Sequence, residues 1–261
     1  MMNHWTELSI TFANQRNYLD ELFRVYSIVP EKIREIDQDK WKQFEKAFAN
    51  GCNGDIIKTL LKLKLFPIKD SYVAYLKKDA TSIVRNPKTI DRLCAQLREM
   101  GLDKIWEKCS EPKETNRQIG PLFRRWLEKK ELGFPLLNID EFRQTKDDAV
   151  LIGSDAILAD FARSKLDYRG EKGLDFLARV RKTYIIGEAK FLTDFGGHQN
   201  AQFEYAKNLL QDNTAKAVKI AILDGVLYIT GRNKMFSFLK SHKENYNILS
   251  CLLLREFLHQ I

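Results

Sequence analysis

Cysteine, histidine and methionine are scarce in this chain of 261 residues, which contains four of each, and proline occurs six times. No two cysteines form a C-x-x-C pair, and no cysteine stands at zinc-site spacing from a histidine. These absences argue against a structural zinc site. We expect the four cysteines to be buried free thiols in a reducing compartment.

Signals for membranes and export are also missing. The densest apolar run without a charge covers only residues 248–254, far fewer than the roughly 20 residues that cross a bilayer. The N-terminus has no basic segment followed by an apolar core, so we expect no signal peptide. The G-x-x-x-x-G-K-[ST] loop of ATP-driven motors is absent. We therefore expect a cytoplasmic protein with no membrane partner.

Basic residues outnumber acidic residues in this chain. The formal net charge is +8 and the sequence pI is about 9.2, while 44% of residues are hydrophobic and 30% are charged. This composition is typical of a globular protein that buries a core. A basic surface attracts polyanions, although many basic proteins bind no nucleic acid.

The stretch from residue 172 to residue 190 is the most informative part of the chain. Residues 174–180 and 183–189 are rich in strand-forming side chains and predict the two arms of a β-hairpin. Arg181 and Lys182 stand between the arms at the position of a tight turn, although neither is a favoured turn residue.

Charged side chains converge at one end of this predicted hairpin. Glu188 and Lys190 are two residues apart and project to the same face, and Asp175 is their expected neighbour on the other arm. Two carboxylates and one ammonium suit metal-dependent hydrolysis of a phosphodiester. Carboxylates bind Mg²⁺, which lowers the pKa of a bound water, and a lysine orients that water or stabilises phosphate charge.

The acid-x-Lys pattern alone is weak, because it occurs three times. Glu111–Lys113 contains a proline and predicts a loop, and Glu128–Lys130 lies on the polar side of a predicted helix. Only Glu188–Lys190 ends an apolar β-run that follows another strand carrying an acid. The alternative is the solvated end of an edge strand. The apolar run favours a buried strand, where a carboxylate is costly unless it is paired or metal-bound.

The spacing of these residues resembles the PD-(D/E)XK nuclease signature. Gly173-Leu174-Asp175 is followed, after twelve residues, by Glu188-Ala189-Lys190, with Leu174 in place of the usual proline. Three further runs resemble one group of type II restriction endonucleases, so that the resemblance covers roughly residues 70–210. They are RNPKTI (85–90), PKETNRQIGPLF (112–123) and FLTDFGGHQNAQF (191–203).

This resemblance implies a fold and an activity. The fold is α/β: a restriction-endonuclease-like core with a mixed β-sheet flanked by helices. The activity is Mg²⁺-dependent, sequence-specific hydrolysis of double-stranded DNA in host defence, leaving 5′-phosphate ends. Asp175 and Glu188 would hold the Mg²⁺, and Lys190 would position or activate the water. The implied partners are a second copy of the chain, since palindromic sites match two-fold symmetry, and a companion DNA methyltransferase that acts on the same site without a stable complex.

Further residues are candidates for the metal site and for DNA contact. In such nucleases the helix before the hairpin can add an acid to the metal site. Asp155 and Asp160 are the candidates here, although Asp155 also fits as a plain acid in a first helical turn.

Arginine side chains pair well with guanine bases, and Asn or Gln side chains with adenine bases. Side chains of these types stand in a polar loop and near the start of the helix after the hairpin, where helix capping is the alternative. They are Asn116, Arg117, Gln118, Gln199 and Gln202.

The chain divides into a helical region, residues 1–144, which would grip DNA and give support, and a catalytic core, residues 145–261. In the first region we expect a helix that begins at Pro30, one over 56–66 that carries Lys58, Lys62 and Lys64, and one from Pro87 that ends near Gly101. The three lysines predict either a phosphate-facing surface or a solvated helix face.

In the second region we expect a helix from Ser154, a helix to about residue 210, a strand over 216–223, a turn at Asp224-Gly225 and another strand over 226–230. Closing helices are expected over 234–239 and 248–258, and residues 133–148 as an irregular connection.

Two alternative functions fit the same residues. One is a repair or junction-resolving nuclease that recognises DNA structure or damage. The other is a non-catalytic DNA-binding protein that keeps the fold, against which the intact acids and lysine argue. The paired-histidine signature of other metal nucleases is absent.

Overall fold

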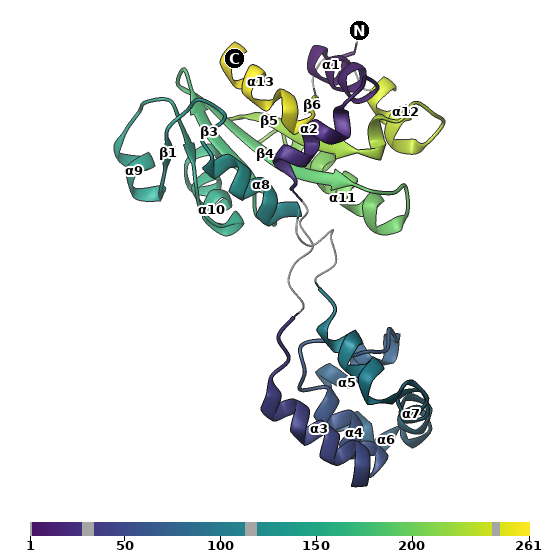
Figure 1. The fold of residues 1–261 in the computed structure, drawn as a ribbon. Coiled ribbons are helices and arrows are strands. Elements are labelled where there is room, and N and C mark those ends of the chain that lie inside the picture. The colour runs from purple at the N-terminus through teal and green to yellow at the C-terminus, as the bar shows by residue number, and fades with distance from the viewer. Residues whose placement is uncertain (1, 28–33, 113–118, 242–245) are drawn as a thin grey trace. The chain divides into compact units, whose positions relative to one another are not determined.

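The computed structural model describes residues 2–27, 34–112, 119–241 and 246–261 (Figure 1). The chain forms two compact units. We call residues 1–28 with 115–261 the sheet unit and residues 29–114 the helical unit. The predicted boundary lies between residues 144 and 145, whereas this division places the described residues 2–27 and 119–144 in the sheet unit. A DNA-gripping role for the N-terminal region stays a prediction.

The described residues of the sheet unit form one mixed sheet in the order β1-β2-β3-β4-β5-β6. Strand β3 is antiparallel to both of its neighbours, β2 and β4. Strand β1 is parallel to β2. Strands β4, β5 and β6 run parallel to one another. The strands are β1 (Leu136–Leu137), β2 (Ala149–Leu151), β3 (Phe176–Val180), β4 (Thr183–Leu192), β5 (Val218–Gly225) and β6 (Asn247–Leu249).

Helices flank both faces of this sheet, as predicted. Successive residues of a strand face opposite ways. Ile185 of β4 belongs to a core cluster with Leu22 and Phe123, whereas Ile186 belongs to a separate cluster with Leu158 and Phe161. The helices of the sheet unit are α1 (His4–Ala13), α2 (Tyr18–Val25), α8 (Ile119–Glu128), α9 (Ile139–Gln144), α10 (Asp155–Leu166), α11 (Gly197–Gln211), α12 (Lys234–Ser241) and α13 (Leu254–Gln260), with short 3-10 helices η2 (Val226–Tyr228) and η3 (Cys251–Leu253).

The predicted hairpin is confirmed as β3 and β4. Phe176 pairs with Gly187 and Val180 with Thr183, so the register is the expected one. Arg181 and Lys182 have φ values of 48° and 68°. Positive φ at both central residues is the mark of a type I′ turn, whose twist matches that of the strands. Here strand pairing overrides the weak turn propensity of Arg181 and Lys182.

Four other local expectations are wrong. Asp224 and Gly225 continue β5 instead of forming a turn, and residues 226–228 form η2 instead of a strand. The run from 248 begins as β6, because Ile248 pairs with Ala221 of β5 and extends the sheet, and only its later part is helical. Residues 133–148 are not irregular, since they contain β1 and α9, which begins with a capping box between Asn138 and Glu141.

The helical unit has a core of its own, built around Phe44, Ile57, Leu93 and Leu97. Its helices are α3 (Gln38–Asn50), α4 (Asn53–Leu60), α5 (Ser71–Lys78), α6 (Ser82–Arg85) and α7 (Pro87–Ser110). The helix that begins at Pro87 is interrupted at Gly101 as expected, because Gly101 has a non-helical φ of 75° and ψ of 163°. A second helical segment follows the kink and reaches Ser110. Pro30, where a helix was expected to begin, lies outside the described residues. Residues 34–37 are not helical, and α3 begins at Gln38.

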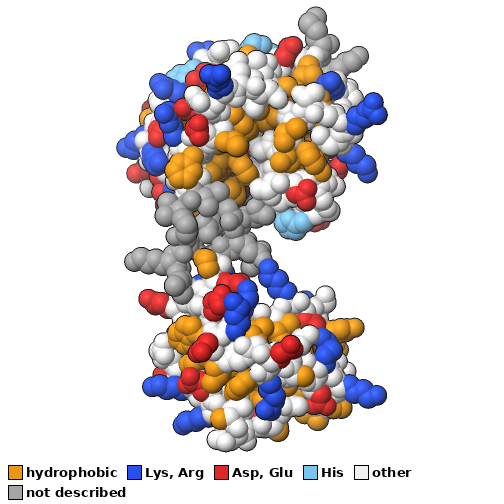
Figure 2. All heavy atoms as spheres, turned by 45° about the vertical axis from the view of Figure 1, so that its right-hand side comes forward, with side chains coloured by type: hydrophobic (Ala, Val, Ile, Leu, Met, Phe, Trp, Pro, Cys, Tyr) orange, Lys and Arg blue, Asp and Glu red, His pale blue; other side chains and the backbone are white. Residues whose placement is uncertain are grey.

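Basic side chains are spread over the surface. On the face that Figure 2 shows, Lys and Arg side chains are scattered over both units and do not gather into one patch. The net charge of +8 therefore does not by itself mark a DNA-binding surface on this face. The site has to be located from particular residues.

Candidate active site

The segment before β3 fixes the position of Asp175. Asp175 N donates a hydrogen bond to Gly187 O at 3.1 Å, and Leu174 N donates to Asp155 O of α10 at 3.1 Å. Gly173 packs so closely on α10 that a Cβ built there would lie 2.4 Å from Asp155 Cβ. Only glycine allows this approach, so residue 173 ties the loop to the helix and places the next acid at the end of the hairpin.

Strand β4 carries the other two charged residues into the interior of the sheet. Glu188 is paired with Ala221 and Lys190 with Leu223 of β5, while the hairpin partner β3 lies on the other side. Glu188 is only 7% exposed. A buried carboxylate needs a partner, and Lys190 supplies one.

The three predicted residues meet at one point. Lys190 Nζ donates to Asp175 Oδ2, to Glu188 Oε2 at 2.7 Å and to Ala189 O at 3.1 Å. Ala189 N also donates to Asp175 Oδ2 at 3.0 Å. The structure therefore brings together the two carboxylates and the ammonium that the spacing predicted, with the carbonyl of Ala189 as an additional oxygen.

Burial and charge shift the pKa values in this cluster. Burial raises the pKa of Glu188 to about 7; the Lys190 ammonium opposes this rise, and the Asp175 charge adds to it. For Lys190, burial lowers the pKa, but the charges of Asp175 and Glu188 raise it by more, so its net shift is upward. Lys190 is thus held as a cation, while Glu188 is poised to exchange a proton near neutral pH.

A cavity of about 330 Å³ lies beside the cluster, and Glu188 forms part of its wall. Lys172 Nζ lies 3.0 Å from the ring centroid of Tyr205 at this cavity, a cation–π contact. The cavity lies between α11 and the segment before β3, and it gives Glu188 access to solvent. The sequence indicated no role for Lys172 or Tyr205, because only the fold brings residues 172 and 205 together.

The remaining candidate residues do not join this cluster. Asp155 Oδ1 accepts a hydrogen bond from Arg124 at 2.5 Å, and the exposed Asp160 pairs with Arg163 at 2.9 Å. Among the described residues, no three His, Cys, Asp or Glu side chains form a group that could hold a metal. The positions of Asp155 and Asp160 therefore give no support to a third acid.

The residues suggested for DNA contact are placed only in part. Gln199 is 6% exposed, and its side-chain oxygen accepts from Thr193 N at 3.4 Å. Gln202 is half-buried and lies 3.3 Å from His198 Nδ1. Asn116, Arg117 and Gln118 lie outside the described residues. DNA contact by these five stays a prediction.

Comparison with known proteins decides the family. A family model described as Tsp45I type II restriction enzyme matches residues 3–261. The chain belongs to this family. It is accordingly a site-specific deoxyribonuclease, which separates it from the repair nuclease and the non-catalytic protein that the sequence left open. No curated protein matches the chain, and no solved structure does. No helix within the described ranges is long and apolar enough to cross a membrane.

The type II restriction enzyme family implies a divalent metal ion, and the cluster fits one. Three oxygens, from Asp175, Glu188 and Ala189, already surround a positive charge, the Lys190 ammonium. They are hard donors of the kind that Mg²⁺ prefers, and Mg²⁺ commonly keeps water in its other positions.

Proposed function

We propose that this restriction endonuclease hydrolyses the phosphodiester bonds of double-stranded DNA with Mg²⁺ held by Asp175 and Glu188. The observation that carries the proposal is the convergence of both carboxylates on the ammonium of Lys190, at distances set by the hairpin. The chemistry that Mg²⁺ supplies in such a site is a lowered pKa of bound water and neutralisation of phosphate charge.

The protein side chains would have distinct tasks. Asp175 and Glu188, together with the carbonyl of Ala189, provide the negative charge that holds the cation. Lys190 is a cation in this environment, so it acts as a donor that orients the attacking water and stabilises charge on the phosphate oxygens. The strand pairing of β4 with β3 and β5 fixes the backbone that carries Glu188 and Lys190.

The wider role follows from this chemistry. We infer that the enzyme recognises a fixed DNA sequence, leaves 5′-phosphate ends and cuts foreign DNA in the cytoplasm as part of host defence. A companion methyltransferase would protect the same sites in the host. A homodimer matches the two-fold symmetry of a palindromic site, and sedimentation of the enzyme with and without duplex DNA tests that assembly.

Digestion of unmethylated phage DNA tests the proposal. With Mg²⁺ we expect discrete fragments, and with a chelator in place of Mg²⁺ we expect none. End labelling would show 5′-phosphates, and the fragment ends would define the recognition sequence. A continuous smear would contradict sequence specificity, and discrete cutting in chelator would contradict the metal requirement.

A further inference from the structure

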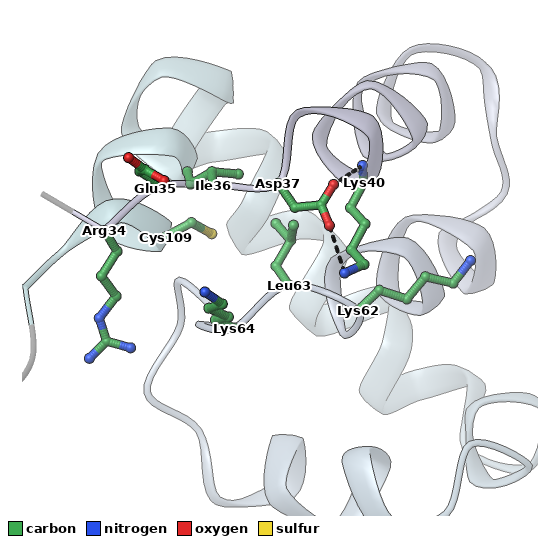
Figure 3. A pocket seen from close by; sticks show the side chains of 9 residues that line it. All are labelled: Arg34, Glu35, Ile36, Asp37, Lys40, Lys62, Leu63, Lys64 and Cys109. Carbon is green, nitrogen blue, oxygen red and sulfur yellow. Dashed lines mark hydrogen bonds and ion pairs between the residues drawn. The ribbon is translucent and has the colours of Figure 1, made fainter.

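A second polar pocket lies in the helical unit, in a part of the chain to which the catalytic cluster does not belong. Its volume is about 330 Å³, about ten times the share of one water in the liquid. Figure 3 shows its side chains, which come from the segment that enters α3 and the first turn of α3, from the turn that follows α4, and from the end of α7. The lining residues are Arg34, Glu35, Ile36, Asp37, Lys40, Lys62, Leu63, Lys64 and Cys109.

Positive charge dominates this pocket. Four of the lining residues are cations and two are carboxylates. Asp37 is already committed, because it accepts from Lys40 N at 3.2 Å and pairs with Lys40 Nζ at 2.7 Å. Hydrogen bonds from Lys40 also hold the pKa of Asp37 below its usual value. No carboxylate within the described ranges pairs with Lys62, Lys64 or Arg34, so their charge is available to a ligand.

Arg34 adds a more specific signal. Its backbone N–H is fixed by Ser110 O at 2.9 Å, which holds this residue against the end of α7. Its Nε is buried and has no hydrogen-bond partner in the described part of the chain. Leaving a buried donor unsatisfied is costly, and an anionic oxygen that enters the pocket would relieve that cost.

The pocket is suited to binding and not to reaction. Burial raises the pKa of the Cys109 thiol to about 12, so the pocket contains no thiolate nucleophile. Glu35 and the committed Asp37 are its carboxylates. In Figure 3, Arg34 and Lys64 stand on one side and Lys40 and Lys62 on the other. A guanidinium and ammonium groups are donors that match the oxygens of a phosphate.

We propose that this pocket binds a backbone phosphate of the DNA substrate, away from the phosphodiester that is cut. This inference rests on the proposed function, since it takes the substrate of the sheet unit as the ligand of the helical unit. It assigns Lys62 and Lys64 to phosphate binding. The sequence alone had left two alternatives for these lysines, a phosphate-facing surface and a solvated helix face. The contact would be independent of base sequence, because it is made to the backbone.

The test compares two charge-matched double variants of the full chain. Lys62→Gln with Lys64→Gln removes two cations from the pocket. Lys42→Gln with Lys46→Gln removes two exposed cations from α3 that do not line it. Binding to a labelled duplex is measured without Mg²⁺ from about 50 to about 200 mM salt, a range in which phosphate contacts dominate the salt dependence. Circular dichroism confirms that both variants are folded.

We expect the pocket variant to bind duplex DNA severalfold more weakly and to lower the salt slope by about 1, as the loss of one phosphate contact does. The α3 variant should keep the wild-type slope, and Arg34→Gln should follow the pocket variant. Equal slopes for the two double variants would overturn the proposal. A wild type that neither cuts nor binds DNA would contradict the proposed function as well. A wild type that does both, together with a pocket variant whose binding and salt slope equal those of the wild type, would contradict this inference alone.

Discussion

Glu188 and Lys190 are two residues apart on β4, and Lys190 Nζ lies 2.7 Å from Glu188 Oε2. The same ammonium donates to Asp175 on the neighbouring arm. One cation therefore bridges two carboxylates that would otherwise repel each other in a buried place. This relationship explains why the three residues occur together, and it determines how each should respond to substitution.

Asp175→Asn should weaken Mg²⁺ binding by about tenfold or more, because it removes one of the two charged ligands. Cleavage of DNA at saturating substrate should fall by at least about a hundredfold. Calorimetric titration with Mg²⁺ measures the first effect, and single-turnover cleavage measures the second.

Asp160→Asn is the matched control for Asp175→Asn. Asp160 is an exposed acid that pairs with Arg163, so its loss should change neither quantity by more than about twofold. An equal loss of Mg²⁺ binding in both variants would show that Asp160 belongs to the metal site and that the arrangement of ligands described here is incomplete.

The raised pKa of Glu188 predicts how stability depends on pH. Between pH 4.5 and about 7 the folded protein keeps a proton on Glu188 that the unfolded chain has released. The free energy of unfolding should therefore fall as pH rises through this window, by about 3 kcal/mol at most for this group. Glu188→Gln cannot titrate, so it should lack this part of the pH dependence.

Urea unfolding of wild type and Glu188→Gln without metal, at several pH values from 4 to 8, measures the difference. The stability of the wild type relative to the variant should decrease with pH. A constant difference over the whole range would mean that Glu188 has the same pKa in the folded and the unfolded protein, so that burial does not perturb it.

Gly173→Ala should disturb the site from outside the cluster. A Cβ at this position would lie 2.4 Å from Asp155 Cβ, so the loop has to move away from α10. We expect a loss of stability of about 1–3 kcal/mol, as for other overpacked positions. Cleavage should also fall, because the displaced loop carries Asp175.

Gly231→Ala is the control for that substitution, since the nearest atom to a Cβ at 231 is 3.7 Å away. Thermal unfolding and single-turnover cleavage of both variants test the prediction. Wild-type cleavage by Gly173→Ala would show that the position of Asp175 does not depend on this contact.

The cluster of two carboxylates and one ammonium was predictable from sequence because its geometry is local. Asp175, Glu188 and Lys190 lie on the two arms of one hairpin, and the alternation of side chains along a strand places them at one end. The same local rules predicted the cap of α10, where Ser154 accepts from Ile157 N.

Features that depend on distant parts of the chain were not predictable. Asp224-Gly225 has the composition of a turn, yet the Asp224 side chain accepts hydrogen bonds from the Tyr18 hydroxyl at 3.1 Å and from Cys251 N at 3.1 Å. These partners satisfy a fully buried carboxyl inside the fold, so β5 continues through it. The cavity beside Glu188 is likewise lined by Lys172 and Tyr205, whose contact no local pattern indicates.

The most direct test of the central claim compares DNA cleavage by the variants Lys190→Ala and Lys165→Ala. Lys165 is an exposed lysine of α10, so its variant serves as the charge control. Both are measured in single turnover with Mg²⁺ on a duplex that the wild type cuts, after binding to the same duplex without metal has been shown to be unchanged. We predict that Lys190→Ala loses at least about a hundredfold in rate, while Lys165→Ala stays near the wild type. Equal cutting by Lys190→Ala and the wild type would contradict the assignment of the active site to this hairpin.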